Sequence, residues 1–321
     1  MSLHRRQWLA ALPALTILPG AAHAQAWPTR PVRFLVGFAA GGTIDIAARL
    51  LAEKLSPVWG QPVVVENRAG AGGTIAGLAV ARADPDGYTL LVSSAAEVVV
   101  APFTQAGLTY NPQTDLTPIS LIARNPFALV VTAGLPAQTL PELIDLSKRQ
   151  PLTYASSGVG TTTHFVGELF KLRAGVDIEH VPYRGTAQLQ TDLVAGRVQI
   201  AFDAVSAVLP HVQAGRLRMI GLATAVRSPQ APDVPTLSEL GLTGFVGGGW
   251  AGFMGPGALP APLAAKLEAD VRAAMQQGVG AELARRGFDP VGSTSAEFRA
   301  FIAEEVARWG DVAQRAGIRP A

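Results

Sequence analysis

Two glycine-rich turns hold the residues of this chain that are best suited to binding an anion. The first, FAAGGT at residues 38–43, follows an apolar run and precedes a stretch with helical periodicity. The second, SSGVGTT at residues 156–162, has the same setting. The first N–H groups of a helix lack backbone partners and lie at the positive end of the helix dipole. A pair of such turns could hold a carboxylate between them.

Each turn also has a purely structural interpretation. Gly41 and Gly42 could simply permit a tight connection between a strand and a helix, with Thr43 as a cap. Thr161 and Thr162 could cap the second helix in the same way. For one turn alone the two interpretations are balanced, whereas two similar turns in one chain favour binding of a carboxylate.

Three charged residues near strand ends are further candidates. Asp45 lies in the first turn of the expected helix, where it either offsets the helix dipole or accepts from a ligand amino group. Arg184 follows an expected strand and could pair with a carboxylate through two parallel hydrogen bonds, although an exposed arginine is also ordinary there. Asp203 closes the stretch VQIAFDA, and it either caps the next turn or lines the site.

All residues that we expect to bind the ligand lie at the carboxyl ends of expected strands or in the turns that follow them, because ligands of α/β proteins collect there. They are Phe38, Gly41, Gly42, Thr43, Asp45, Ser94, Ser156, Ser157, Gly160, Thr161, Thr162, Tyr183, Arg184, Gly185 and Asp203.

The first part of the chain alternates strand-like and helix-like stretches. Short apolar runs suit a parallel sheet that is covered on both faces. The helical stretch after the first turn keeps Ile44, Ala47, Leu51 and Leu55 on one stripe. We expect strands at 31–38, 62–67 and 87–94, with helices at 43–55 and 74–83.

The middle of the chain repeats this β-α alternation and forms a second unit. We expect strands at 127–132, 152–157, 178–183 and 198–204 and helices at 140–149, 161–173 and 187–195, followed by a strand at 247–256 and helices within 261–317. Extended crossings near 122–127 and 223–228 would join the units. The prediction is an α/β protein with domain 1 at 25–124 and 226–321, and domain 2 at 125–225.

The N-terminal segment predicts export. Residues 1–24 combine a basic start, an apolar stretch and Ala22-His23-Ala24 before Gln25, as in a secretory signal peptide. Arg5 and Arg6 resemble a twin-arginine signal, and the route, Sec or twin-arginine, stays open. Of the 26 basic residues these two lie in the signal, which leaves 24 basic against 24 acidic residues. A neutral chain of this kind is not expected to bind nucleic acid.

Metal sites and enzyme motifs are not predicted. The chain has no cysteine, and its histidines lack the spacing of metal ligands. The first turn lacks the lysine of a P-loop, and Ile75 stands where the third glycine of a dinucleotide fingerprint belongs. The surroundings of Ser157 do not match Gly-x-Ser-x-Gly, although His164 is near in sequence. We expect no catalytic residue and no cofactor, and an exported hydrolase is the least favoured alternative.

Seven stretches, taken in order, resemble the Bug family, the extracytoplasmic solute receptors of tripartite tricarboxylate transporters. The resemblance runs from Trp27 to about residue 315. The stretches are GGTID (41–45), GQPVVVENRAGAGGTIAG (60–77), PDGYTLL (85–91), YASSGVGTTTHFVGELFK (154–171), HVPYRGTAQLQTDLVAGRVQIAFD (180–203), LPHVQAGRLR (209–218) and RSPQAPDVPTLSELG (227–241).

The resemblance implies a monomeric, two-domain periplasmic binding protein of type II, with a ligand cleft between the domains. A small carboxylate would bind to main-chain amides and bridging waters of residues 38–45 and 156–162. The receptor would then deliver it to the membrane subunits of the transporter. A ligand-sensing module for a signalling partner is the alternative, since the same closure can serve either purpose.

The chain departs from the family pattern at three places. Ala39 and Ala40 precede the two glycines where relatives commonly have a Pro-Phe-x-Pro segment. After Ser94 the sequence continues AAEVVVAPFTQAG instead of an Asn-Pro segment, which leaves the pocket wall around Glu97 undefined. Arg184 stands where lysine is usual, so the charge is kept but planar pairing is favoured.

Overall fold

The computed structural model describes residues 27–320, and the expected signal peptide at residues 1–24 lies outside them. The described chain is a mixed α/β structure, as the alternation of stretches predicts. Its strands are β1 (Val32–Val36), β2 (Val63–Asn67), β3 (Thr89–Ser93), β4 (Leu116–Thr132), β5 (Thr153–Ser156), β6 (Glu179–Pro182), β7 (Ile200–Ala204), β8 (Leu217–Leu222), β9 (Gly248–Pro256) and β10 (Asp289–Pro290). Its α-helices are α1 (Thr43–Trp59), α2 (Thr74–Ala81), α3 (Ala101–Thr104), α4 (Leu140–Arg149), α5 (Thr162–Ala174), α6 (Thr186–Val194), α7 (Val205–Gln213), α8 (Ala261–Ala274), α9 (Gly280–Arg285) and α10 (Ser295–Arg315).

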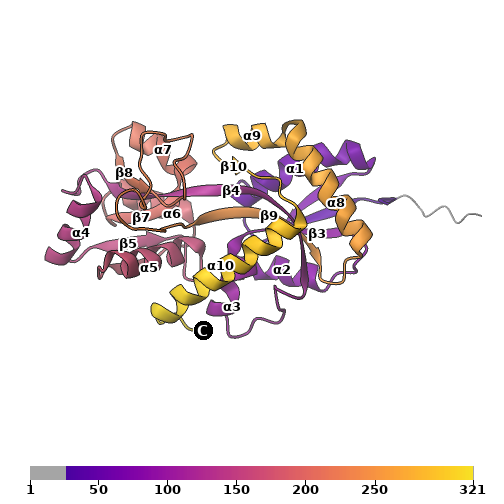
Figure 1. Cartoon of the computed structure of the whole chain (residues 1–321), viewed down its shortest axis with the longest axis horizontal. Coiled ribbons are helices and arrows are strands. Elements are labelled where there is room, and N and C mark those ends of the chain that lie inside the picture. The colour runs from indigo at the N-terminus through magenta and orange to yellow at the C-terminus, as the bar shows by residue number, and fades with distance from the viewer. Residues whose placement is uncertain (1–26, 321) are drawn as a thin grey trace, which may run out of the picture.

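The strands form two parallel groups that two antiparallel strands connect. The sheet order is β2-β1-β3-β9-β4-β7-β5-β6, and β8 and β10 also pair with β4. Strands β1, β2 and β3 are mutually parallel, as are β5, β6 and β7, whereas β9 is antiparallel to both β3 and β4. We call the two groups with their helices the first and second halves, and Figure 1 shows β4 and β9 running between them.

Strand β4 carries the chain from the first half to the second. Residues 116–126 pair with β9, and residues 127–132 pair with β7 and β8. This change of partner falls at the crossing that we expected near 122–127. The chain then stays with the second half until Gly247, whose N–H donates to the Ala223 carbonyl, and it re-enters the first half at Gly248. The division into two domains remains a proposal, with this re-entry as its structural basis.

The apolar stripe predicted for α1 packs against one face of the first half's sheet. Ile44, Ala47, Leu51 and Leu55 are buried and share a core cluster with residues of β1 and α8. Burying a large apolar side chain stabilises the fold by about 1.5–3 kcal/mol, so this stripe holds the helix on the sheet. Gly60, with φ of +63°, ends the helix in the left-handed conformation that glycine favours. The first helix is therefore fixed in place immediately behind the first glycine turn.

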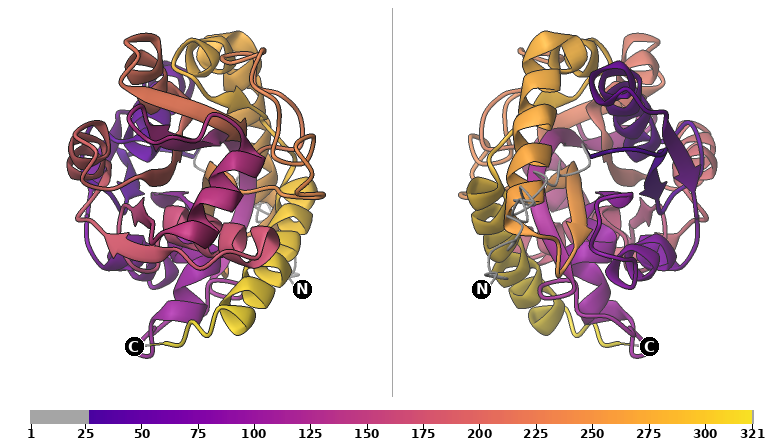
Figure 2. Two further views of the ribbon diagram at one scale, coloured as in Figure 1. Left: turned by 90° about the vertical axis from the view of Figure 1, so that its left-hand side faces the viewer. Right: turned by 90° about the vertical axis from the view of Figure 1, so that its right-hand side faces the viewer.

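Helix α10 lies along one flank of the molecule, as both views of Figure 2 show, and it contacts residues of both halves. Its Trp309 ring lies 6.1 Å from the ring of Phe165 in α5 of the second half. Its buried Glu305 accepts from Trp309 Nε1 at 3.0 Å and from Trp250 Nε1 of β9 at 3.3 Å. The helices expected within 261–317 are confirmed, and the last of them ties the crossing strand β9 to the second half.

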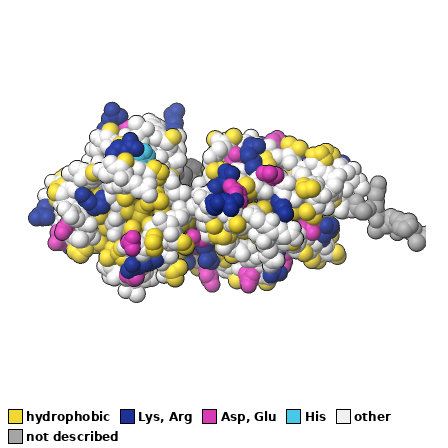
Figure 3. All heavy atoms as spheres, turned by 90° about the horizontal axis from the view of Figure 1, so that it is seen from above, with side chains coloured by type: hydrophobic (Ala, Val, Ile, Leu, Met, Phe, Trp, Pro, Cys, Tyr) yellow, Lys and Arg dark blue, Asp and Glu magenta, His cyan; other side chains and the backbone are white. Residues whose placement is uncertain are grey.

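Some elements were not among the expected ones. They are α7, β8, β10, and the π-helical turn η2 (Ala96–Val100) with the short helix α3 that directly follows it. In residues 27–320 we find no helix long and apolar enough to cross a membrane. Seen from above in Figure 3, the outline of the molecule narrows between the two halves.

Candidate ligand-binding site

The first loop, residues 38–43, connects β1 to α1. Gly41 has φ of +82°, a conformation that favours glycine, and it gives the turn its shape. Gly42 is the N-cap of α1, and no described side chain forms a cap hydrogen bond there. The N–H groups in the first turn of α1 are therefore available to a ligand, as the sequence predicted.

Asp45 supports the first loop from behind and is 1% exposed. Its carboxylate accepts from Gly41 N at 2.8 Å, from Arg49 Nε at 2.8 Å and from Asn67 Nδ2 at 2.9 Å. Burial opposes ionisation of Asp45, but the hydrogen bonds from these donors outweigh it, and its pKa is lowered. Asp45 thus has a third role beyond the two we considered: it is an anchor that holds the loop.

Asn67 completes this anchor and was missed in the sequence. Its Nδ2 donates to the Phe38 carbonyl at 3.0 Å as well as to Asp45, and its Oδ1 accepts from Arg49 Nη2 at 3.1 Å. Asn67 ends β2 beside Val36 at the end of β1, so the sheet register places it next to the loop. Only a predicted register of β1 and β2 could have identified it.

The second loop, residues 156–163, connects β5 to α5 and uses its hydroxyl groups internally. Thr161 is the N-cap of α5, and its side chain accepts from His164 N. Ser157 N and Oγ both lie 2.9 Å from Thr163 Oγ1. Thr161 Oγ1 donates to the Gly158 carbonyl at 2.7 Å. Unlike α1, helix α5 is capped by its own loop.

A stack of three rings lies beneath the second loop, two of them buried (Tyr154, His164) and one partly buried (His180). The His180 ring lies between Tyr154 and His164, with centroids 4.8 Å and 4.2 Å away. His180 Nε2 is 2.6 Å from Ser156 Oγ, and Gly160 N donates to His164 Nδ1 at 3.3 Å. Burial, with the neighbouring His164, lowers the pKa of His180 to about 4. Both ends of the loop thus rest on neutral imidazoles, a support that the sequence analysis missed.

The hydrolase alternative finds no support in this geometry. Ser157 Oγ lies beside the Thr163 hydroxyl rather than beside an imidazole. The serine that does contact a histidine, Ser156, is fully buried.

A third group of predicted residues follows β6 and β7. Gly185 is the N-cap of α6 with φ of +107°, and its N–H donates to the Ser157 carbonyl, which joins this group to the second loop. Arg184 is exposed and forms no salt bridge within the described chain. The Tyr183 hydroxyl donates to Asp192 at 3.0 Å.

Asp203 is buried at the end of β7. It accepts from Gln190 Nε2 at 2.9 Å and from Ala204 N at 2.8 Å. Burial raises its pKa to about 6. Both of its oxygens already have intramolecular donors, as expected for a residue that fixes the start of α7.

The segment from Ser94 to Thr104 links the two loops, and sequence reasoning named only Ser94 and Glu97 within it. At its start, Glu97 lies close to Gly73 and to Phe38 of the first loop: a methyl group placed on Gly73 would lie 2.8 Å from Glu97 Oε2 and 3.3 Å from Phe38 Cε2. At its end, a methyl group placed on Gly160 of the second loop would lie 3.1 Å from Thr104 Oγ1. Through this segment the structure brings the two predicted loops into one region.

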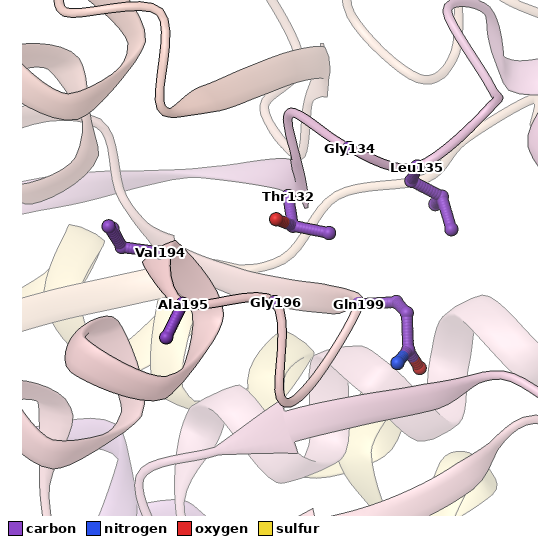
Figure 4. Close-up of a pocket in the computed structure, with 7 residues that line it drawn as sticks. All are labelled: Thr132, Gly134, Leu135, Val194, Ala195, Gly196 and Gln199. Carbon is purple, nitrogen blue, oxygen red and sulfur yellow. The ribbon is translucent and has the colours of Figure 1, made fainter.

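Two pockets lie elsewhere. The pocket in Figure 4, of about 340 Å³, is at the outer end of the second half, and no charged residue lines it. Another, of about 300 Å³, is lined by four arginines, of which Arg30 pairs with Asp86, and Arg33 and Arg68 with Glu66. Neither pocket contains a predicted ligand-binding residue.

Over residues 27–320 the structure has no group of three or more His, Asp or Glu that could hold a metal ion.

Comparison with known proteins identifies similar chains along almost the whole length. The family described as Tripartite tricarboxylate transporter family receptor, TctC, matches residues 47–318. Protein BugT of Bordetella pertussis is 37% identical over 300 residues, which is 92% of each chain.

Solved structures extend this similarity to the fold. A structure from R. palustris with adipate is 36% identical, with a TM-score of 0.84, and the match covers 92% of this chain and all of that one. MatC from Rhodopseudomonas palustris with bound malate is 34% identical, with a TM-score of 0.79 over 89% of this chain and 100% of its own. The structure of the periplasmic binding protein BugD is 31% identical, with a TM-score of 0.80 over 92% of this chain and 100% of its own.

Proposed function

The chain belongs to the TctC family of tripartite tricarboxylate transporter receptors, and we propose that it binds a small carboxylate between its two loops and delivers it to the membrane subunits of such a transporter. The family is one of binding proteins rather than enzymes. The open N-terminus of α1 is the observation that carries the proposal for the ligand.

The first loop is suited to an anion for two reasons. The first-turn N–H groups of α1 have no intrahelical acceptor, and no described residue caps them through its side chain. Asp45, the nearest carboxylate, lies behind the loop and is neutralised by Arg49 and two further donors. The charge of Asp45 therefore does little to oppose the attraction between the helix dipole and the ligand.

The second loop and Arg184 would hold the other side of the ligand. The loop is rigid because its hydroxyls bond to one another, so it offers a fixed surface rather than flexible donors. Arg184, exposed beside Gly185, supplies a guanidinium that can pair with a carboxylate. The relatives from R. palustris with adipate and malate support a carboxylate as the ligand class.

A thermal-shift assay tests this function directly. Protein that has been unfolded, stripped of ligand and refolded is mixed with mono-, di- and tricarboxylates, and with amides of the same acids as controls. At a hundredfold excess over its Kd, a ligand of the folded state stabilises it by about 2.7 kcal/mol, which raises the melting temperature. We expect a shift with at least one acid and none with its amide. No shift with any acid would refute carboxylate binding.

Delivery to a transporter and export are further parts of the proposal. We expect the mature protein to begin at Gln25, in the periplasm, as a monomer whose two domains close on the ligand. N-terminal sequencing of the protein from a periplasmic fraction would test the cleavage site.

Carboxylate uptake by cells that lack this receptor but keep the membrane subunits would test delivery to the transporter. Unimpaired uptake would favour the sensing alternative.

A further inference from the structure

Glu97 is a buried carboxyl group close to the first loop. It is not among the residues that we predicted to bind the ligand, and the proposed function gives it no role. Its side chain is 0% exposed. A methyl group on Gly73 would lie 2.8 Å from Glu97 Oε2 and 3.3 Å from Phe38 Cε2, so the carboxylate and the Phe38 ring both lie close to this glycine. Gly73 is also the N-cap of α2 and has φ of +93°. Glu97 therefore borders the proposed ligand site at the N-terminus of a helix.

Glu97 also occupies the hydrogen-bond donors of Ser94. Ser94 N donates to Glu97 Oε1 at 2.7 Å, and Ser94 Oγ donates to Oε2 at 2.5 Å. The Ser94 hydroxyl oxygen also accepts a hydrogen bond from Ala96 N at 3.1 Å. While Glu97 keeps these bonds, Ser94 has no donor left for a solute carboxylate.

Helix capping alone does not explain why this carboxylate is buried. The chain has another Ser/Thr-x-x-Glu arrangement at the start of α10, where Thr294 and Glu297 form a capping box. Glu297 is exposed, and its hydrogen bonds to Thr294 lower its pKa. Burial instead raises the pKa of Glu97 to about 7. Because an exposed glutamate caps equally well, the burial of Glu97 has a cost that capping does not require.

The surroundings leave the charge of Glu97 without a cationic partner. In the described part of the chain Glu97 forms no salt bridge. The titratable group that faces it is Tyr110, whose hydroxyl donates to the Glu97 backbone carbonyl and whose pKa is raised by burial and by the Glu97 charge. At pH values above its pKa of about 7, Glu97 thus places a negative charge next to the position where the solute is expected.

We propose that Glu97 sets the charge selectivity of the site, so that the receptor prefers a solute with one carboxylate and an uncharged or cationic opposite end over a dicarboxylate. The carboxylate of the solute binds at the open N-terminus of α1, while a second carboxylate near Glu97 is repelled by a like charge that solvent does not screen. This inference rests on the proposed function, because it needs the solute to bind at the first loop.

A ligand series of equal length tests the proposal. Hexanoate, 6-aminohexanoate and adipate share a six-carbon chain and differ only at the far end. We expect the wild-type protein at pH 8 to bind hexanoate or 6-aminohexanoate at least about tenfold more tightly than adipate, as a like-charge interaction worth one pKa unit would give. In Glu97→Gln the ratio should move toward adipate by a similar factor, while Glu297→Gln should leave it unchanged.

The pH dependence of the wild-type protein gives a second measurement that requires no variant. Protonation of Glu97, whose pKa is about 7, should improve binding of adipate relative to hexanoate between pH 8 and pH 6. If the wild-type protein binds the series but neither the variant nor pH changes the ratio, this inference fails and the proposed function stands. If it binds none of these acids and no other carboxylate, both fail.

Discussion

The two loops are similar in sequence, but the structure holds them in different ways. The first loop is held from outside, by Asp45 on the following helix and by Asn67 on a neighbouring strand. The second is held by its own hydroxyls and by histidines beneath it. As a result, the helix after the first loop keeps its N-terminus uncapped, whereas Thr161 caps the helix after the second.

Because of this difference, we expect the two loops to have different roles in the proposed site. An uncapped helix N-terminus offers N–H donors to an anion, while a capped one has already used some of them. The first loop is therefore the charge-binding side of the proposed site, and the second is a rigid surface that Arg184 supplements. Three perturbations test this division, in order of decreasing expected effect on stability.

The largest effect is expected from removing the anchor of the first loop. Asp45→Ala removes the acceptor that the part-buried donors of Gly41, Arg49 and Asn67 share, which should lower the free energy of unfolding by about 1–3 kcal/mol. Urea denaturation measures this loss. Carboxylate affinity should fall as well, because the loop loses its fixed shape.

A surface aspartate provides the control for the Asp45 variant. Asp86 pairs with Arg30 through side chains that are 40% and 61% exposed. Asp86→Ala should therefore cost less than about 1 kcal/mol. If Asp45→Ala were no more destabilising than Asp86→Ala, the anchoring role of Asp45 would be refuted.

Lowering the pH should change the free energy of unfolding by a smaller amount. At mildly acidic pH this change should come from His180 beneath the second loop, before Asp45 at the first loop is protonated. His180 has a pKa of about 4 in the folded protein, against 6.5 for an unperturbed histidine. The unfolded chain therefore takes up this proton first, and the contribution of His180 to stability should fall as the pH drops from about 6.5 to about 4. The pKa of Asp45 is lower in the folded protein than its unperturbed value of 3.8. Asp45 therefore keeps its contribution to stability until the pH falls below 3.8.

Urea denaturation of the wild-type protein and of His180→Gln, at pH 7 and pH 5, isolates this effect. The variant cannot take up this proton, so its stability should fall less between the two pH values. Solvent screening limits the size of the difference, because the imidazole is only partly buried. An equal pH dependence in both proteins would contradict the role of His180.

The smallest effect on stability is expected from adding the missing cap to the first loop. Gly42 has φ of −75° and ψ of 171°, which suit a serine N-cap, but the added Cβ would lie 3.3 Å from the Ala39 carbonyl oxygen, a close contact that offsets part of the gain. Gly42→Ser should therefore raise the free energy of unfolding by at most roughly 0.3 kcal/mol. At the same time it should weaken carboxylate binding, since the new hydroxyl competes for the N–H groups.

The matched variant in the second loop should show the opposite pattern. Thr161→Ala removes an existing cap, which should cost about 1 kcal/mol of stability. Its effect on carboxylate affinity should be small, because the second loop does not supply the charge-binding donors. If Gly42→Ser left affinity intact, the uncapped N-terminus of α1 would not be the anion site.

The sequence was sufficient for those parts of the fold that depend on local patterns. The helix expected at 140–149 is α4 with the same bounds, and the strands around both glycine turns are confirmed. Helix α7 and strand β8 were missed. The Pro210 within α7 is a local signal against a helix, and the packing of Val205 and Val208 in the core overrides it.

Within the site, the sequence determined which turns could bind an anion, because glycine content, strand ends and helix starts are local properties. The tertiary structure decided what each polar group does there, because its partners are distant in sequence. Asn67 lies 22 residues from Asp45, and His180 lies 24 residues from Ser156. Sheet register and helix packing bring these groups together, and burial determines the charges that a ligand will meet.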